Sequence, residues 1–349
     1  MPAGSVSPVE SITLALDRWR AGDSADVLRS EFLDVLASAP DPRDPRGRRY
    51  PLAGLLAIAI LATAAGMRGY AGFATWAATV PAEVLARLGI RFRRPSEKTF
   101  RSVLSRLDPA ELDRRLGAYF TMVAAAETVA TGGLLAVAVD GKTLRGARRM
   151  GAAATHLVAV FAHRARLVLG QLAVGEKSNE IPCVRALLRT FRKARLLVTV
   201  DAMHTQTATA KLICGPLKSH YLMIVKSNQP KLLARIQALP WAQVPLTHSE
   251  QSQPAHGRVE TRTLKVLTTV RGIGFPHARQ VIQITRDRFA VATGQRSREI
   301  VYAICSLAFE HAHPRTIAAW LRDHWSIEVR REVALVERIN RLEDRMRGG

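Results

Sequence analysis

Hydrophobic positions change their spacing near residue 130 of the chain. From residue 12 to residue 125, apolar residues recur three or four positions apart, which is typical of amphipathic helices. Polar residues of the kind that cap helices precede two of these stretches, at Ser96 and Asp108. The pattern therefore predicts an all-helical N-terminal domain over residues 1–125.

The apolar run at residues 51–67 is the one long run in this part. It is rich in Ala and Gly and falls short of the ~20 strongly apolar residues that a membrane-spanning helix needs. We therefore expect a buried core helix and no membrane association. The N-terminus also lacks the basic-then-apolar order of a signal peptide, so we expect a cytoplasmic protein.

Short apolar runs of strand length dominate after residue 130. Strands are predicted at 134–139, 157–161, 167–174, 196–200, 221–225, 258–267, 281–285 and 300–307, and helices at 179–191, 205–214, 230–239 and 317–325. Three strands followed by alternating helices and strands are the order of an RNase H-like α/β fold, with a mixed sheet flanked by helices. We place this domain at residues 131–328, with a β-rich insertion around 240–307 and an atypical tail at 329–349.

Composition adds a strong positive charge to this picture. The chain has 51 Lys and Arg against 29 Asp and Glu, a net charge of +22. Such an excess is most often the footprint of a nucleic-acid-binding protein. A basic membrane-surface protein, or the arginine bias of a GC-rich gene, would give the same excess. The helical region fits a helix-turn-helix DNA reader or a plain helical bundle equally well.

The segment 41–51 concentrates this charge. Its three prolines and one glycine exclude a helix, and we expect a mobile loop. Four arginines of the loop are candidates to contact DNA phosphates: Arg43, Arg46, Arg48 and Arg49. A solvated linker is the alternative. The three cysteines lie far apart in apolar contexts and are expected to be free thiols.

Two of the predicted strands end in an aspartate, Asp140 and Asp201. The carboxyl ends of strands face the crevice where open α/β sheets place their chemistry. One Asp-Gly pair would indicate only a turn, but the repeated pattern predicts a two-metal site for phosphoryl transfer. Glu328, after the last predicted helix, is the candidate for the third carboxylate. Glu260 competes with it, although an ordinary cross-strand ion pair would also explain Glu260.

A series of short motifs resembles the bacterial insertion-sequence transposases with a DDE site, in particular the ISAs-type group of the IS-four-like superfamily. In chain order the pieces are Asp41-Pro42-Arg43 with Gly47-Arg48-Arg49-Tyr50-Pro51-Leu52, Pro95-Ser96-Glu97-Lys98-Thr99-Phe100, Asp140-Gly141-Lys142, Glu176-Lys177-Ser178-Asn179-Glu180-Ile181, Asp201-Ala202-Met203-His204-Thr205-Gln206, Lys226-Ser227-Asn228-Gln229-Pro230, His256-Gly257-Arg258-Val259-Glu260 and His324-Trp325-Ser326-Ile327-Glu328. No single piece is decisive, and the order of all eight carries the resemblance.

The resemblance implies a DNA transposase that cleaves and transfers strands at terminal inverted repeats. It implies Mg²⁺ or Mn²⁺, expected as two ions, held by Asp140, Asp201 and Glu328. Its partners would be the terminal repeats, target DNA and a second copy of the chain in a homodimer, in a nucleoid-associated protein. Further candidates for phosphate contact are Lys142, Arg145 and Lys226, and candidate accessory residues are His204, Glu260, His324 and Trp325.

The chain departs from the family after Glu328. Family members continue with an Asn-Ser-Leu-His-Trp-like helix, whereas here Val329-Arg330-Arg331-Glu332 follows. This end resembles a frameshifted or truncated one. A transposase remnant that binds DNA without cutting it is therefore the alternative, and another RNase H-like nuclease acting on structured DNA is a third possibility.

Overall fold

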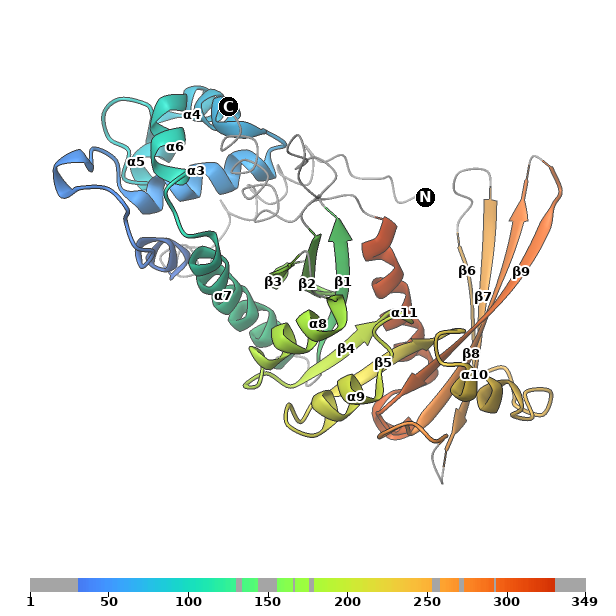
Figure 1. Cartoon of the computed structure of the whole chain (residues 1–349). Coiled ribbons are helices and arrows are strands. Elements are labelled where there is room, and N and C mark those ends of the chain that lie inside the picture. Colours follow the sequence, from blue (N-terminus) through green and yellow to red (C-terminus); the bar gives the residue numbers. More distant parts are fainter. Residues whose placement is uncertain are drawn as a thin grey trace. The chain divides into compact units, whose positions relative to one another are not determined.

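The computed structural model describes residues 31–129, 134–143, 156–165, 167–175, 179–252, 258–269, 273–291 and 293–329. Their contacts divide the chain into two units with a boundary between Thr121 and Met122. Figure 1 shows helices in the first unit and a sheet with helices in the second. Among the described residues, no helix is long and apolar enough to cross a membrane.

Helices make up most of the described first unit. They are a helix at 31–37, η1 (Pro45–Gly47), α3 (Leu52–Ala64), α4 (Gly69–Thr79), α5 (Ala82–Arg87), α6 (Glu97–Leu104) and α7 (Pro109–Val129), whose last turns belong to the second unit. The apolar run predicted as a core helix forms α3, in which Leu55 and Ile58 are fully buried. Both predicted helix starts are observed, because Ser96 accepts a hydrogen bond from the Thr99 amide and Asp108 from the Ala110 amide.

The described second unit contains a nine-stranded mixed sheet with the strand order β3-β2-β1-β4-β5-β9-β8-β7-β6. The strands are β1 (Leu135–Thr143), β2 (His156–Ala162), β3 (Val168–Val174), β4 (Leu196–Val200), β5 (His220–Val225), β6 (His248–Gln251), β7 (Arg258–Thr268), β8 (Gln280–Ala290) and β9 (Arg296–Cys305). Strands β1, β4 and β5 are parallel, and the other neighbours are antiparallel. The predicted class, an α/β protein with a mixed sheet and helices, is confirmed.

The helices of this unit pack on the sheet (Figure 1). They are α8 (Glu180–Arg189), α9 (Thr207–Cys214), α10 (Pro230–Gln237), η2 (Phe309–His311) and α11 (Pro314–Val329). Helix α8 packs on β2 and β3, and α9 packs on β5. Helix α11 packs on β1 and β4 and buries Ile317 and Leu321 against Leu197. It thereby joins the parallel strands to the β6–β9 region.

Several elements differ from the sequence-based expectation. Strand β1 does not stop at Asp140 but continues to Thr143, because it pairs with β2 through Thr143↔His156. The region 240–256, for which no individual strand was predicted, contains β6. Strand β8 continues past the predicted 285 to Ala290, and β9 begins at Arg296, before the predicted 300, and ends at Cys305. These additional residues carry charges on both faces and have no apolar pattern, so the sequence does not indicate them.

Candidate active site

Asp140 and Asp201 occupy matching positions on neighbouring parallel strands. The last paired residues of β1 and β4 are Val139 and Val200, and each aspartate is the next residue of its strand. Adjacent strands lie about 4.8 Å apart, so the two backbone positions are close neighbours at one edge of the sheet. Both residues are half-buried. The predicted neighbouring aspartates are consistent with this register, although Asp140 lies within β1 and only Asp201 directly follows a strand end.

The turn that follows Asp201 is held by a set of hydrogen bonds. The His204 amide donates to Asp201 Oδ1 at 3.3 Å, which orients that carboxylate. The Thr205 hydroxyl lies 2.6 Å from the carbonyl oxygen of Ile224, at the end of β5. The Gln229 amide group in turn donates to the Thr205 carbonyl at 2.8 Å. These contacts fix the Asp201 turn to the neighbouring strand and to the start of α10.

Glu180 links this turn to β1 and β2. It is the first residue of α8, and its carboxylate contacts the imidazoles of His156 and His204, with Oε2 at 3.2 Å from His204 Nε2. The same carboxylate lies over Gly141, where an added Cβ would come within 2.5 Å of Oε2. Glu180 therefore sits between the residue that follows Asp140 and the turn that carries Asp201. Glu180 was not among the predicted site residues, although the motif Glu176–Ile181 contained it.

A buried polar chain lies behind the strand ends. The Thr199 hydroxyl of β4 lies 3.0 Å from His163 Nε2 and 3.0 Å from His324 Nδ1 of α11. All three side chains are buried. Burial lowers the pKa of His163 to about 3, and the neighbouring His324 adds to that effect. Both imidazoles are therefore neutral near pH 7, and they join α11 to the sheet through Thr199.

His324 also locates the end of α11 relative to the predicted site. Burial lowers the pKa of His324 to about 4, while the Asp201 carboxylate acts in the opposite direction and raises it. This electrostatic effect means that His324 lies near Asp201. Glu328 follows His324 by four residues, about one turn further along the same helix. Its side chain lies outside the described part of the structure.

Glu260 is enclosed by arginines of the β7–β8 hairpin. Its carboxylate contacts Arg262 and accepts hydrogen bonds from Arg286 and Arg288, each at 3.2 Å. Burial acts to raise the pKa of Glu260, but Arg262 and Arg286 outweigh this effect and hold the pKa below its ordinary value. This arrangement is the cross-strand ion pair that we set against a metal-binding role, and it leaves Glu328 as the better candidate.

Trp325 packs on the same arginines. The guanidinium groups of Arg262 and Arg286 lie 5.3 Å and 4.8 Å from the centre of its ring, within the range of cation–π contacts. The indole thus anchors α11 to the β7–β8 hairpin. We interpret Trp325 and His324 as residues that hold the helix carrying Glu328, one from each side.

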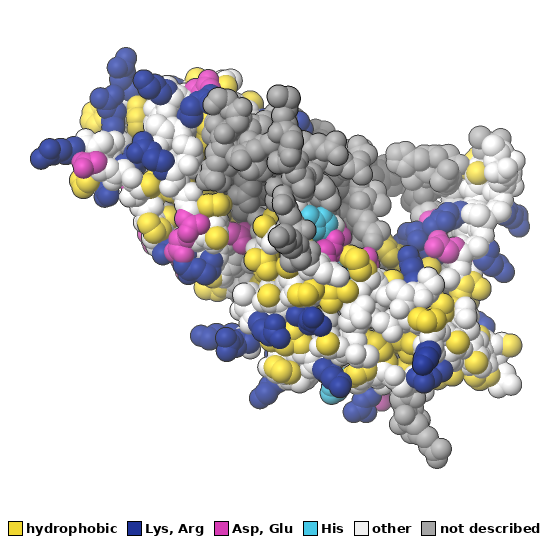
Figure 2. Space-filling view, viewed as in Figure 1, with side chains coloured by type: hydrophobic (Ala, Val, Ile, Leu, Met, Phe, Trp, Pro, Cys, Tyr) yellow, Lys and Arg dark blue, Asp and Glu magenta, His cyan; other side chains and the backbone are white. Residues whose placement is uncertain are grey.

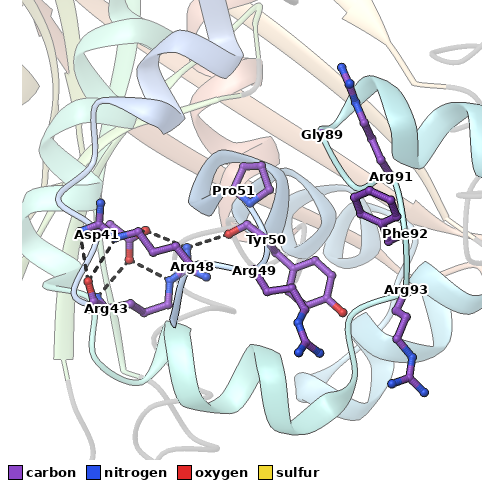
Figure 3. Close-up of a pocket in the computed structure, with 10 residues that line it drawn as sticks. All are labelled: Asp41, Arg43, Arg48, Arg49, Tyr50, Pro51, Gly89, Arg91, Phe92 and Arg93. Atoms are coloured by element: carbon purple, nitrogen blue, oxygen red, sulfur yellow. Dashed lines mark hydrogen bonds and ion pairs between the residues drawn. The ribbon is translucent and has the colours of Figure 1, made fainter. Parts of the chain in front are cut away.

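In the first unit, the segment 41–51, which we call the arginine-rich loop, is held by specific side-chain contacts (Figure 3). Arg43 is buried and donates to both oxygens of Asp41, at 2.8 and 2.7 Å, and to the Tyr50 carbonyl. Hydrogen bonding from Arg43 lowers the pKa of Asp41. The expected mobile loop is therefore corrected: it contains η1 and is closed by this ion pair. Arg43 shapes the loop, and a buried guanidinium is poorly placed to contact DNA.

The other predicted phosphate contacts have different placements. Exposed side chains are those of Arg46, Arg48, Arg49 and, after β5, Lys226. Figure 2 shows many further Lys and Arg side chains on the visible surface of the helical unit. The Lys142 side chain and the whole of Arg145 lie outside the described residues.

The donor atoms at the strand ends suit a hard divalent cation, which prefers carboxylate oxygens. Two half-buried aspartates occupy neighbouring backbone positions there, and a backbone amide orients one of them. Among the described side chains, no three His, Cys, Asp or Glu lie close enough together to hold a metal ion.

Comparison with protein families decides the classification. The Transposase DDE domain matches residues 131–332, and the DDE_Tnp_1-associated domain matches residues 33–120. The chain belongs to the DDE transposase family. The prediction of a DDE transposase from its motifs is thereby confirmed, and this family acts by DNA cleavage and strand transfer with divalent metals.

Known proteins similar to this DDE transposase include two bacterial relatives. An uncharacterized protein of Xanthobacter autotrophicus from the dhlA 3′ region is 30% identical over 68% of this chain and 84% of that protein. A candidate transposase of Escherichia coli (strain K12), YncI, is 37% identical over 36% of this chain and 53% of its own length. A solved structure, the piggyBac transposase synaptic complex with hairpin DNA, matches 97% of this chain and 74% of its own chain at 9% sequence identity. Its TM-score of 0.36 is too low to support an argument.

Proposed function

We propose that this chain is the transposase of an insertion sequence, which cleaves DNA at terminal inverted repeats and transfers the resulting strand ends. The observation that carries the proposal is the register of β1 and β4, which brings Asp140 and Asp201 to one edge of the sheet. Family membership supplies the reaction class. The series of motifs supports the narrower assignment to the ISAs-type group of the IS-four-like superfamily.

The strand order supports an RNase H-like catalytic domain. Strands β3, β2 and β1 form an antiparallel meander, and β4 and β5 continue the sheet parallel to β1. The insertion, β6–β9, extends the sheet on the far side of β5. In this arrangement the two acids belong to neighbouring interior strands of the sheet: Asp140 lies in β1 and Asp201 directly follows β4.

Glu328 is proposed as the third ligand. Its support is indirect and comes from α11, which packs on β1 and β4 and carries His324 near Asp201. A residue about one turn beyond His324 is within the region where a third carboxylate would be needed. We propose that Asp140, Asp201 and Glu328 hold Mg²⁺ or Mn²⁺, two ions in the active complex.

The chain's own residues then have distinct tasks in the reaction. When bound, two ions would activate a water or a 3′-hydroxyl and would stabilise the leaving oxygen. The carboxylates fix the scissile phosphate relative to that chemistry, and the amide of His204 keeps one Asp201 oxygen oriented. Exposed cationic side chains, Lys226 among them, hold flanking phosphates, so DNA binding falls steeply with salt.

The test is cleavage of a terminal-repeat duplex by purified protein in the presence of Mn²⁺. We expect Asp140→Asn, Asp201→Asn and Glu328→Gln each to abolish cleavage and to weaken Mn²⁺ binding measured by electron paramagnetic resonance. Glu310→Gln, at an exposed acid of η2, is the matched control and should cleave normally. Equal cleavage by all variants would refute the site.

The same assay separates the alternatives. Binding of the duplex by wild-type protein without any cleavage would favour a remnant that only binds DNA. Cleavage without joining to a target duplex would favour a nuclease of another kind. Sedimentation of the complex with paired duplexes tests the proposed homodimer.

A further inference from the structure

Phe92 is exposed to an unusual degree. Its side chain is 96% exposed, whereas no other large hydrophobic residue in the described part of the chain exceeds 57%. It lies in the segment between α5 and α6, and its neighbours Arg91 and Arg93 are exposed as well. Because nearly the whole phenyl ring is accessible, contact with a flat apolar group of a ligand would bury apolar surface and be favourable.

The segment that carries Phe92 is anchored at both ends. Before it, Ile90 is buried and donates its amide to the Leu85 carbonyl at 2.9 Å. After it, the guanidinium of Arg94 donates to the carbonyl groups of Ala77 and Val80 at the end of α4. The exposure of Phe92 is therefore built into the loop, and the ring is presented from a fixed base.

Gly89 tightens the entry to this segment. Its φ of +78° is a backbone conformation that residues with a side chain rarely adopt, and an added Cβ would lie 3.0 Å from the Pro51 ring. The close approach holds the α5–α6 segment against the start of α3. It also brings Phe92 to the same hollow as the arginine-rich loop.

That hollow has a volume of about 560 Å³, within the range of pockets that take small ligands. Figure 3 shows Tyr50 and the arginine-rich loop on one side and Phe92 on the other. Five arginines line it: the buried Arg43 and the exposed Arg48, Arg49, Arg91 and Arg93. The one acid in the lining, Asp41, is paired with the buried Arg43. The hollow therefore combines a net positive charge with an aromatic face.

We propose that this hollow binds a nucleotide of the DNA. The arginines contact its phosphates, and Phe92 stacks on its base, which is unstacked from the neighbouring base of the duplex. The inference rests on the proposed function, because that function supplies DNA as the ligand. Phosphate oxygens match the guanidinium groups, and the apolar face of a base matches the ring. A single aromatic between cations suits a wedge at one base step.

The experiment uses the full chain and a terminal-repeat duplex with 2-aminopurine placed at successive positions, whose fluorescence rises when the base unstacks. We expect wild-type protein to raise the fluorescence at one position. Phe92→Ala should abolish this rise and weaken binding about tenfold, the loss expected for one stacked base. Phe92→Trp should retain both. Since the ring touches little protein, the Tm of each variant should equal that of the wild type.

Two further variants distinguish the roles of ring and charge. Replacing both Arg91 and Arg93 by Gln should lower the salt dependence of binding, whereas Phe92→Ala should leave that dependence unchanged. Phe309→Ala, at a partly exposed ring of the second unit, is the matched control and should change neither.

The proposal is overturned if Phe92→Ala binds as tightly as the wild type and gives the same fluorescence. It is also overturned if the variant loses binding to vesicles of anionic lipid while its DNA binding is unchanged. If wild-type protein binds no duplex at any salt concentration, the proposed function itself fails, and that outcome differs from either of these.

Discussion

The carboxylate of Glu180 lies against the backbone of Gly141, at a point where a methyl group would come within 2.5 Å of its Oε2. Because Gly141 directly follows Asp140, this contact ties the start of α8 to the strand that carries the first acid. Through His204 the same carboxylate reaches the turn of the second acid. Glu180 is thus positioned to control the separation of the two acids without being one of them.

Gly141→Ala should displace Glu180 and disturb the first acid. The added Cβ meets only the end of the Glu180 side chain, which can move aside. We therefore expect a loss in unfolding free energy near the low end of the about 1–3 kcal/mol seen at overpacked sites, together with strongly reduced cleavage. Urea denaturation and the Mn²⁺-dependent cleavage assay measure the two effects. Gly47→Ala is the matched control, because nothing lies within 4 Å of its added Cβ. A variant as active and stable as the wild type would contradict the packing described here.

Glu180→Gln should lower the cleavage rate while leaving DNA affinity unchanged. The amide has nearly the shape of the carboxylate, but it removes the negative charge that faces His156 and His204. We expect a rate loss of about tenfold or more, corresponding to about 1.4 kcal/mol in the barrier. Single-turnover cleavage and fluorescence anisotropy separate rate from binding. An unchanged rate would reduce Glu180 to an ordinary charge at a helix start.

Thr199→Val tests the buried chain between the two histidines. Valine has nearly the same shape but leaves His163 and His324 without their common hydroxyl. Removing one partner of a buried polar group costs about 1–3 kcal/mol, so the denaturation midpoint should fall. Thr209→Val is the matched control, since the buried Thr209 hydroxyl has no hydrogen-bond partner among the described residues and its loss should be neutral or stabilising. Similar midpoints for the two variants would contradict the role of Thr199.

The strands and helices that carry the fold were predictable wherever an apolar face is buried. Strand β4 is buried along its whole length, and four of its five residues are apolar. The outer part of β8, Arg286 to Ala290, was not predictable, because neither face there is fully buried. Strand β1 continues past Asp140 only through its pairing with β2, a non-local contact that no pattern within β1 records.

The candidate site was predictable where its chemistry follows a strand end. Asp140 and Asp201 each interrupt an apolar run and so are conspicuous in the sequence. Glu180 was missed because an acid in the first turn of a helix is common for electrostatic reasons alone. Thr199 was missed because one hydroxyl within a buried strand gives no periodic signal. The ion pair between Arg43 and Asp41 was not predictable, because two opposite charges two residues apart in a loop give no sign that one of them is buried.

Acid should destabilise the protein through His163. Its pKa is about 3 in the folded state, against 6.5 for an ordinary imidazole, because burial penalises the charged form. The groups that face it are His324, through Thr199, and the Asp323 carboxylate, whose oxygen lies 3.9 Å from Nδ1. Below pH 6.5 the His163 imidazole binds a proton in the unfolded chain but stays neutral in the folded chain. The free energy of unfolding therefore has its full value, as far as His163 is concerned, above pH 6.5. It decreases as the pH falls from 6.5 toward 3, by about 1.4 kcal/mol per pH unit.

His163→Gln should make this pH dependence shallower, because the amide can still reach the Thr199 hydroxyl but does not titrate. Urea denaturation of both proteins between pH 7 and pH 4 measures the change, and the difference between their slopes should approach one proton. The variant should therefore lose some stability at neutral pH and regain it relative to the wild type in acid. Parallel curves across this range would mean that His163 is already protonated in the fold, in an ion pair with Asp323 instead of a neutral contact with Thr199.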